Sequence, residues 1–275
     1  MYNTDRYLRN QILITAEQQR SIKNTKVILA GSGLGSLIAE TALRLGFERL
    51  VLVDGDQVEM SNLNRQNYTQ TQVKQLKNIA LKERLLNINP DAQIECFNHF
   101  LTLDNLDHFF QTYVTDTSIA INALDYDTNQ IPLHFDKYCL AQQIPVIHPA
   151  NFSWAAVAFV IAGDHPNLED LASHPENFGL PKGGLDVESN LIGLIMHKGE
   201  ENGIDFSWAK QYLHQIQQAK IDSEDYSFPQ LSMGAYAVAG LITSIMLSLT
   251  KEKNQAKENS SVKYFPEMYI NTLSI

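Results

Sequence analysis

The chain has 275 residues, of which 44% are hydrophobic and 19% are charged, a balance typical of a folded globular protein with a full core. Its formal net charge of -10 argues against a general nucleic-acid-binding surface, which needs clustered Lys and Arg. The two cysteines, Cys96 and Cys139, form no CxxC pair, so we expect neither zinc nor a disulfide framework. The polar start and the lack of a long apolar run predict a cytoplasmic protein without membrane contact.

Residues 1–25 form an amino-terminal arm ahead of the first predicted strand. Arg6 and Arg9 are three positions apart, which places them on one side of a helical turn. Residues 15–22 predict a short helix with Thr15 as its N-cap. From spacing alone, the two arginines are best explained as part of a solvated face.

A strand, a glycine turn, a helix and a second strand follow in residues 26–54. The apolar run 27–30 predicts a strand buried on both faces, and the run 50–53 predicts another that ends in Asp54. Between them, Gly46 is a natural stop for the helix. Three glycines at GxGxG spacing, close to the GxGxxG fingerprint, open that helix: Gly31, Gly33 and Gly35.

This arrangement indicates nucleotide binding. Glycines let backbone N–H groups approach phosphate oxygens, and the helix N-terminus favours anions. Asp54 lies at the offset expected of an acid that accepts hydrogen bonds from ribose hydroxyls. The alternative is a tight strand-to-helix turn in a Rossmann domain that binds no nucleotide.

The polar segment 55–66 comes directly after this unit. It belongs at the carboxyl ends of the strands, where ligands bind in open α/β sheets. Arg65 is suited to hold a phosphate bidentately. The alternative is a capped loop that leads into a helix predicted over 73–86, with Lys74 and Lys77 on its first turns. The polar residues of the segment are Asp56, Asn62, Asn64, Arg65 and Gln66.

Strands and helices alternate along the next hundred residues. Strands are predicted at 92–97, 118–123, 145–149 and 155–162, and helices at 103–113 and 130–142. This alternation predicts an α/β, Rossmann-like doubly wound and mostly parallel sheet with additional C-terminal strands. Asp125 follows a strand on the glycine-loop side, where a carboxylate suits Mg²⁺ held with nucleotide phosphates. The alternative is an N-cap or turn acid.

The remaining chain has weaker sequence signals. Residues 163–205 predict an irregular loop, because they are rich in Gly, Pro, Asn and acids. Helices are predicted over 206–220 and 232–250, and a closing strand lies in 263–273. We therefore expect one domain over 1–275. Its parts are an arm (1–25), a nucleotide-binding core (26–162), a variable substrate or crossover loop (163–205) and C-terminal helices with a closing strand (206–275).

Four motifs together carry a family resemblance: RYLRN at 6–10, GSGLGS at 31–36, DGDQVEMSNLNRQ at 54–66 and VKQLK at 73–77. In this order they resemble the ubiquitin-activating-like adenylyltransferases, the ThiF/MoeB/HesA family. The resemblance covers most of residues 5–162 and, more loosely, the helix at 232–250 and the final strand. RYLRN and DKYCLAQQIPVI look most like the branch that adenylates the C-terminal residue of a peptide in microcin maturation.

The resemblance implies ATP and Mg²⁺ rather than NAD, with a carboxylate joined to AMP as pyrophosphate leaves. Lys77 would neutralise charge on the leaving pyrophosphate, Asp125 would bind Mg²⁺, and Arg9 would reach across a homodimer into the partner's active site. The implied catalytic residues are Arg9, Arg65, Lys77 and Asp125. The implied nucleotide-binding residues are Gly31, Gly33, Gly35, Asp54, Asp56, Asn62 and Gln66.

The leading hypothesis is activation of the C-terminus of a peptide or of a small ubiquitin-like or sulfur-carrier protein. The alternatives are activation of a tRNA-base carboxylate, a non-catalytic scaffold subunit, and an NAD-linked oxidoreductase. Three departures from the family pattern argue against thioester transfer. The paired CxxC zinc motifs are missing, residues 163–205 contain no acceptor cysteine, and the strand-end pattern at 122–126 keeps only its second acid.

Overall fold

The computed structural model describes residues 6–115, 118–125, 130–152, 154–181, 187–206, 209, 229–252 and 262–272. The strands in these residues are β1 (Lys26–Ala30), β2 (Arg49–Val53), β3 (Gln93–Phe97), β4 (Ser118–Asn122), β5 (Val146–Phe152), β6 (Ala155–Ile161) and β7 (Tyr269–Thr272). The α-helices are α1 (Ala16–Asn24), α2 (Gly35–Leu45), α3 (Lys77–Ile88), α4 (Leu103–Tyr113), α5 (Ile131–Ala141), α6 (Leu168–Ser173), α7 (Val187–Glu201) and α9 (Ser232–Glu252). Short 3-10 turns are η1 (Leu8–Asn10), η2 (Met60–Asn62), η3 (Gln70–Gln72) and η4 (Pro175–Phe178).

The described strands form one sheet in the order β3-β2-β1-β4-β5-β6-β7. The first five are parallel, whereas β6 and β7 add antiparallel. This confirms the predicted mostly parallel, doubly wound sheet with additional C-terminal strands. The strand order reverses between β1 and β4, and open α/β sheets commonly bind ligands at the carboxyl ends of the two strands at such a point.

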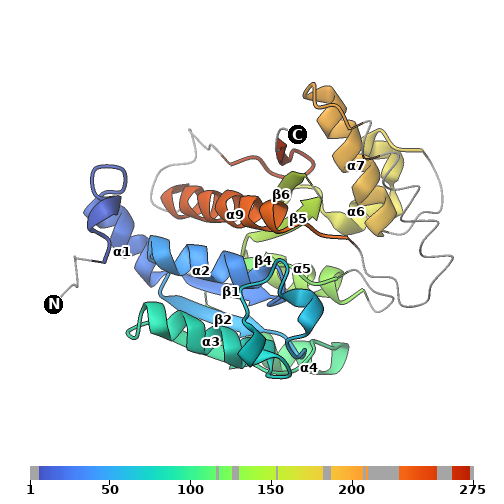
Figure 1. The fold of residues 1–275 in the computed structure, drawn as a ribbon. Coiled ribbons are helices and arrows are strands. Elements are labelled where there is room, and N and C mark those ends of the chain that lie inside the picture. The colour runs from blue at the N-terminus through green and yellow to red at the C-terminus, as the bar shows by residue number, and fades with distance from the viewer. Residues whose placement is uncertain are drawn as a thin grey trace.

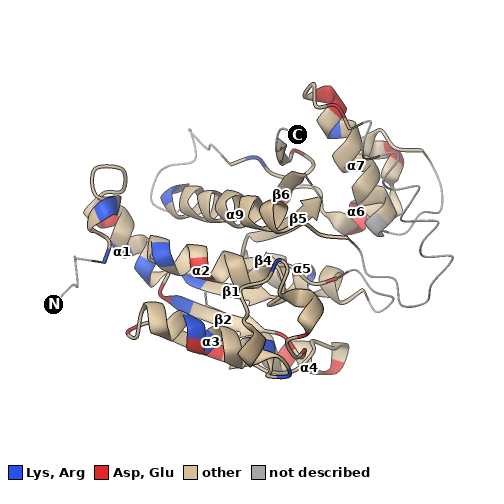
Figure 2. Ribbon diagram, viewed as in Figure 1, with Lys and Arg blue, Asp and Glu red and all other residues tan. Residues whose placement is uncertain are grey.

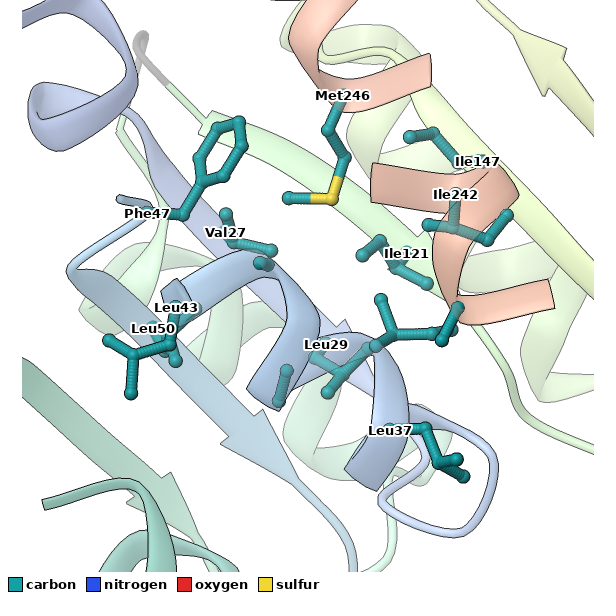
Figure 3. Packing of buried hydrophobic residues seen from close by; sticks show 14 of the residues in the cluster. Val27, Leu29, Leu37, Leu43, Phe47, Leu50, Ile121, Ile147, Ile242 and Met246 are labelled. Atoms are coloured by element: carbon teal, nitrogen blue, oxygen red, sulfur yellow. The ribbon is translucent and has the colours of Figure 1, made fainter. Parts of the chain in front are cut away.

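Successive residues of β1 enter different cores, because side chains alternate between the two faces of a strand. Val27 and Leu29 pack with α2, α3 and α9, while Ile28 and Ala30 pack with α4 and α5. Both faces are therefore covered, which explains the continuous apolar run in β1. Figure 3 shows the first of these cores, with Met246 directed between the sheet and α2.

Helix α9 lies beside α2 over the central strands (Figure 1). Its charged residues are confined to its last turn (Figure 2). Residues 232–251 are long and apolar enough to cross a membrane by length and composition, but 56% of their apolar stretch is buried inside the protein. Its buried side chains, including Ile242 and Met246, make it a core helix of the sheet. Location in the cytoplasm stays a prediction.

Two sequence predictions about element bounds were wrong. The helix predicted from residue 73 begins at Lys77, and Lys74 lies outside it with φ +72°. The segment 163–205, predicted to be irregular, contains α6, η4 and α7, which form a separate core against β6 (Figure 1). The helix predicted over 206–220 lies almost entirely outside the described residues.

Candidate functional site

The glycine loop that joins β1 to α2 needs glycine at Gly31 for a steric reason. Gly31 has φ +93°, and a Cβ there would stand 2.4 Å from the backbone oxygen of Ala123. Gly33 borders the side-chain amide of Gln66, 3.2 Å from an added Cβ. Gly35 faces the sheet, where a Cβ would approach Leu29 Cδ2 to 2.9 Å. The three glycines thus have different packing constraints, and their shared contact with a nucleotide stays a prediction.

Asp54 ties the glycine loop to the end of β2. Its Oδ2 accepts a hydrogen bond from the backbone N–H of Ser32 at 2.7 Å, and its Oδ1 accepts one from the N–H of Asp56 at 2.8 Å. A carboxylate has further lone pairs, so these bonds leave Asp54 able to accept from sugar hydroxyls. These two bonds also fix the orientation in which the Asp54 carboxylate would accept hydrogen bonds from a sugar.

Three polar residues beneath the glycine loop were missed by the sequence reasoning. The Ser32 hydroxyl donates to Asn78 Oδ1 at 2.6 Å, and the Asn78 amide donates to the backbone oxygens of Asp54 and Phe97 at 3.0 and 2.9 Å. Tyr68 donates to the Ser32 oxygen at 2.7 Å, and burial raises the pKa of its phenol, so it stays a donor. The sequence signal for this network was a polar residue, Asn78, next to Lys77 in a predicted helix.

Lys77 is the first residue of α3, and its side chain is largely buried. Its ammonium group contacts the Asp56 carboxylate at 2.8 Å, and its backbone N–H donates to the Asp56 oxygen at 2.9 Å. The side chain of Lys77 is 10% exposed, against 52% for Asp56. Asp56 therefore holds both the ammonium group and the backbone of Lys77.

Arg65 is half-buried in the loop that follows β2. Its Nε donates to Gln230 Oε1 at 2.8 Å, and its Nη1 donates to Asn64 Oδ1 at 2.8 Å and to the Ser61 oxygen at 3.1 Å. Burial lowers the pKa of the Arg65 guanidinium, and the negative charge of Asp125 opposes that effect. An arginine keeps its charge through such a change, so Arg65 remains a cation.

Asn62 and Gln66 flank Arg65 in this loop, with different surroundings. Asn62 is buried, and its Oδ1 accepts from the backbone N–H of Glu59 at 3.0 Å, which closes the η2 turn. The Oε1 of Gln66 is buried without a hydrogen-bond partner among the described residues. Because that oxygen lies beside Gly33, Gln66 could accept a bond from a ligand in the loop.

Asp125 follows β4 and completes the group of charges. It is exposed to solvent, yet desolvation by the surrounding chain raises the pKa of its carboxyl. Lys77 and Arg65 act to lower that pKa, while Asp56 and Asp54 raise it. The structure therefore brings charged residues that follow β2 and β4 into one electrostatic cluster with Lys77 at the start of α3.

The donor set suits magnesium held partly by phosphates. Among the described residues no three His, Cys, Asp or Glu side chains gather as a metal site. Mg²⁺ commonly binds through one or two carboxylates together with nucleotide phosphates and water. Asp125, whose carboxyl group is acted on by the cations Lys77 and Arg65, fits that mode of binding.

Arg9 lies near the amino ends of the parallel strands, whereas this cluster lies at their carboxyl ends. Its neighbour Tyr7 donates a hydrogen bond to the Glu48 carboxylate at 2.9 Å, and Asn10 donates one to the Leu45 oxygen at 3.0 Å. Both partners lie between the end of α2 and the start of β2. Arg9 itself is exposed. It cannot join the cluster of its own chain, and its predicted role across a homodimer stays untested.

Comparisons with known proteins place this geometry in context. The family model described as "ThiF family" matches residues 7–270. The chain is 27% identical over 265 residues to tRNA threonylcarbamoyladenosine dehydratase of Bacillus subtilis (strain 168), covering 90% of this chain and 98% of that protein. It is 42% identical over 91 residues to ubiquitin-like modifier-activating enzyme 5 of Dictyostelium discoideum, covering 32% of this chain and 24% of that enzyme.

Solved structures share the fold. E. coli MccB with AMPCPP and MccA has a TM-score of 0.64 and 18% identity, covering 99% of this chain and 72% of that one. PaaA has a TM-score of 0.64 and 21% identity, covering 98% of this chain and 79% of that one. At this level of identity the two structures establish the arrangement of helices and strands alone.

Proposed function

The chain belongs to the ThiF family, and from this premise we propose that it is an ATP- and Mg²⁺-dependent adenylyltransferase that activates a carboxylate. The observation that carries the proposal is the charge cluster at the glycine loop. Arg65, Lys77 and Asp125 come from three separate segments, and both cations act electrostatically on the Asp125 carboxyl. A scaffold subunit has no need of this arrangement, and an NAD-linked enzyme gives no role to Arg65 and Lys77.

The proposed reaction joins the substrate to AMP. A carboxylate oxygen attacks the α-phosphorus of ATP, the bond to the bridging oxygen breaks, and pyrophosphate leaves as acyl-AMP forms. Both reactants are anions, so cations must offset their repulsion. Arg65 and Lys77 are the cations at this position, and Asp125 would hold Mg²⁺ against the phosphates. No step requires a thiol, in agreement with the burial that raises the pKa of Cys139.

The proposed substrate is the free C-terminus of a peptide or of a small carrier protein. Two comparisons support this class: the shared fold with MccB, solved with MccA, and the sequence match with a ubiquitin-like modifier-activating enzyme. We further propose a homodimer in which Arg9 enters the partner's site. The exposed position of Arg9, away from its own chain's cluster, supports that arrangement.

A second candidate substrate is the carboxylate of a modified tRNA base. The match with tRNA threonylcarbamoyladenosine dehydratase favours it, because that match spans 90% of this chain. The net charge of -10 weighs against extended phosphate contacts. Salt-dependent binding of bulk tRNA at submicromolar concentration would establish the second candidate over the first.

The first test is thermal unfolding with Mg-ATP and, separately, with NAD. A ligand at a hundred times its Kd adds about 2.7 kcal/mol of stability, so Mg-ATP should raise Tm clearly. Asp125→Asn should lose most of that rise, while Asp164→Asn, at an exposed turn at the other edge of the sheet, should keep it. A rise with NAD and none with Mg-ATP would refute the proposal.

The substrate class is tested by pyrophosphate release. Peptides with a free C-terminus should stimulate release, and the same peptides with an amidated C-terminus should not. Arg65→Ala should reduce the stimulated rate by about 10²-fold or more, because it removes a cation from the developing charge. Equal stimulation by the amidated peptides would exclude the C-terminal carboxylate as the acceptor of AMP.

A further inference from the structure

Arg65 is held in place by a residue from the far end of the chain. Its Nε donates to Gln230, which is 165 positions away in sequence and stands just before α9. Its Nη1 bonds to Asn64 and Ser61 within its own loop. The Nη2 group makes no hydrogen bond in the described part of the chain, so one edge of the guanidinium is left for a ligand.

The segment that carries Gln230 is itself fastened at the carboxyl edge of the sheet. The backbone oxygen of Gln230 accepts from the Asn64 amide at 3.1 Å. The next backbone oxygen, that of Leu231, accepts from the Asn151 amide at the end of β5 at 3.2 Å. One bond from the loop after β2 and one from β5 therefore fix the point from which the Gln230 side chain reaches Arg65.

The chemistry of the partner matters as much as its position. An amide oxygen orients a guanidinium without cancelling its charge, whereas a carboxylate at the same place would form an ion pair. An arginine that must attract phosphates is served by a neutral acceptor on Nε. The half-buried position of Arg65 makes this difference larger than it would be in water.

We propose that Gln230 is a positioning residue that aims the free edge of Arg65 at the nucleotide phosphates. This inference rests on the proposed function and adds the start of α9 to the phosphate site. In Gln230→Glu, the new carboxylate would orient Arg65 but neutralise it. In Gln230→Met, a side chain of similar length would neither orient nor neutralise it.

Calorimetric binding of Mg-ATP, together with Tm, tests the inference. Gln230→Glu should weaken Mg-ATP binding about tenfold while Tm stays equal to or above that of the wild type, because an ion pair has been added. Gln230→Met should weaken binding about threefold to tenfold. Gln111→Glu, which adds the same charge on the exposed face of α4, should bind as the wild type does.

The outcomes separate the inference from the proposed function. If Arg65→Ala weakens Mg-ATP binding while both Gln230 variants bind like the wild type, the inference is wrong and the function stands. If Gln230→Glu loses affinity only together with a lowered Tm, Gln230 has a structural role and the inference also fails. If the wild-type protein does not bind Mg-ATP, the proposed function fails, and the inference with it.

Discussion

Substitution of Gly31 by alanine tests whether the glycine loop is fixed by backbone sterics. The residue has φ +93°, which costs an L-amino acid about 1–2 kcal/mol. The new Cβ would also stand 2.4 Å from the Ala123 oxygen, a backbone atom that can move only with β4. Overpacking of this kind typically costs about 1–3 kcal/mol. We therefore expect Gly31→Ala to lower the free energy of unfolding by roughly 2–5 kcal/mol.

Two other glycines serve as matched controls for the same change. At Gly33 the Cβ would meet only the end of the Gln66 side chain at 3.2 Å, so a loss below about 1 kcal/mol is expected. At Gly240, inside α9, nothing lies within 4 Å, and alanine should stabilise by about 0.5–1 kcal/mol. Urea unfolding followed by circular dichroism measures all three. Equal unfolding midpoints for Gly31→Ala and Gly33→Ala would refute the steric reasoning.

Two carboxylates should give opposite dependences of stability on pH. The raised pKa of Asp125 means that its ionisation costs folding energy, so Asp125→Asn should unfold at higher temperature than the wild type at pH 7, with no difference below about pH 4. Burial would raise the pKa of the Glu40 carboxyl, but hydrogen bonds from Arg84 and Arg44 outweigh it and lower that pKa. The ionised Glu40 carboxylate therefore stabilises the folded state at neutral pH, and this stabilisation is lost as pH falls through the lowered pKa. Glu40→Gln should consequently lose less stability than the wild type between pH 7 and pH 3. Calorimetric Tm values across this range check both, and a lower Tm for Asp125→Asn at pH 7 would contradict the first.

The part of the site that could be predicted from sequence is the part that is local. Gly31, Asp54 and Lys77 fall within one strand–helix–strand unit and the loop after it, where glycine spacing and apolar runs are direct signals. Asp125 comes from a later strand, but its place at a carboxyl end was enough to bring it to the same edge. Gln230 had no such signal, because its contact with Arg65 depends on how α9 returns across the sheet.

The two errors in element bounds have identifiable causes. Two backbone hydrogen bonds with Val58 keep residues 73–76 outside α3. The Lys74 N–H donates to the Val58 oxygen, and the Val58 N–H donates to the Gln75 oxygen, both at 2.8 Å. In the segment 163–205, composition suggested a loop, but the Asn167 and Asp170 capping box and the spacing of Leu191 and Leu194 were helical signals. In this segment the periodicity of the apolar residues indicates helices that the composition alone does not.

The position of α9 has a consequence for synthesis of the chain. The face of the sheet that contains Leu29 and Ile121 is covered by α2 and, later, by Ile242 and Met246 from α9 (Figure 3). While the ribosome is still making residues 163–231, that face has no α9 to cover it and remains open to chaperones and to other nascent chains. A truncated chain ending at residue 162 would keep the motifs that are predicted to bind a nucleotide and would still lack the helix that covers this core.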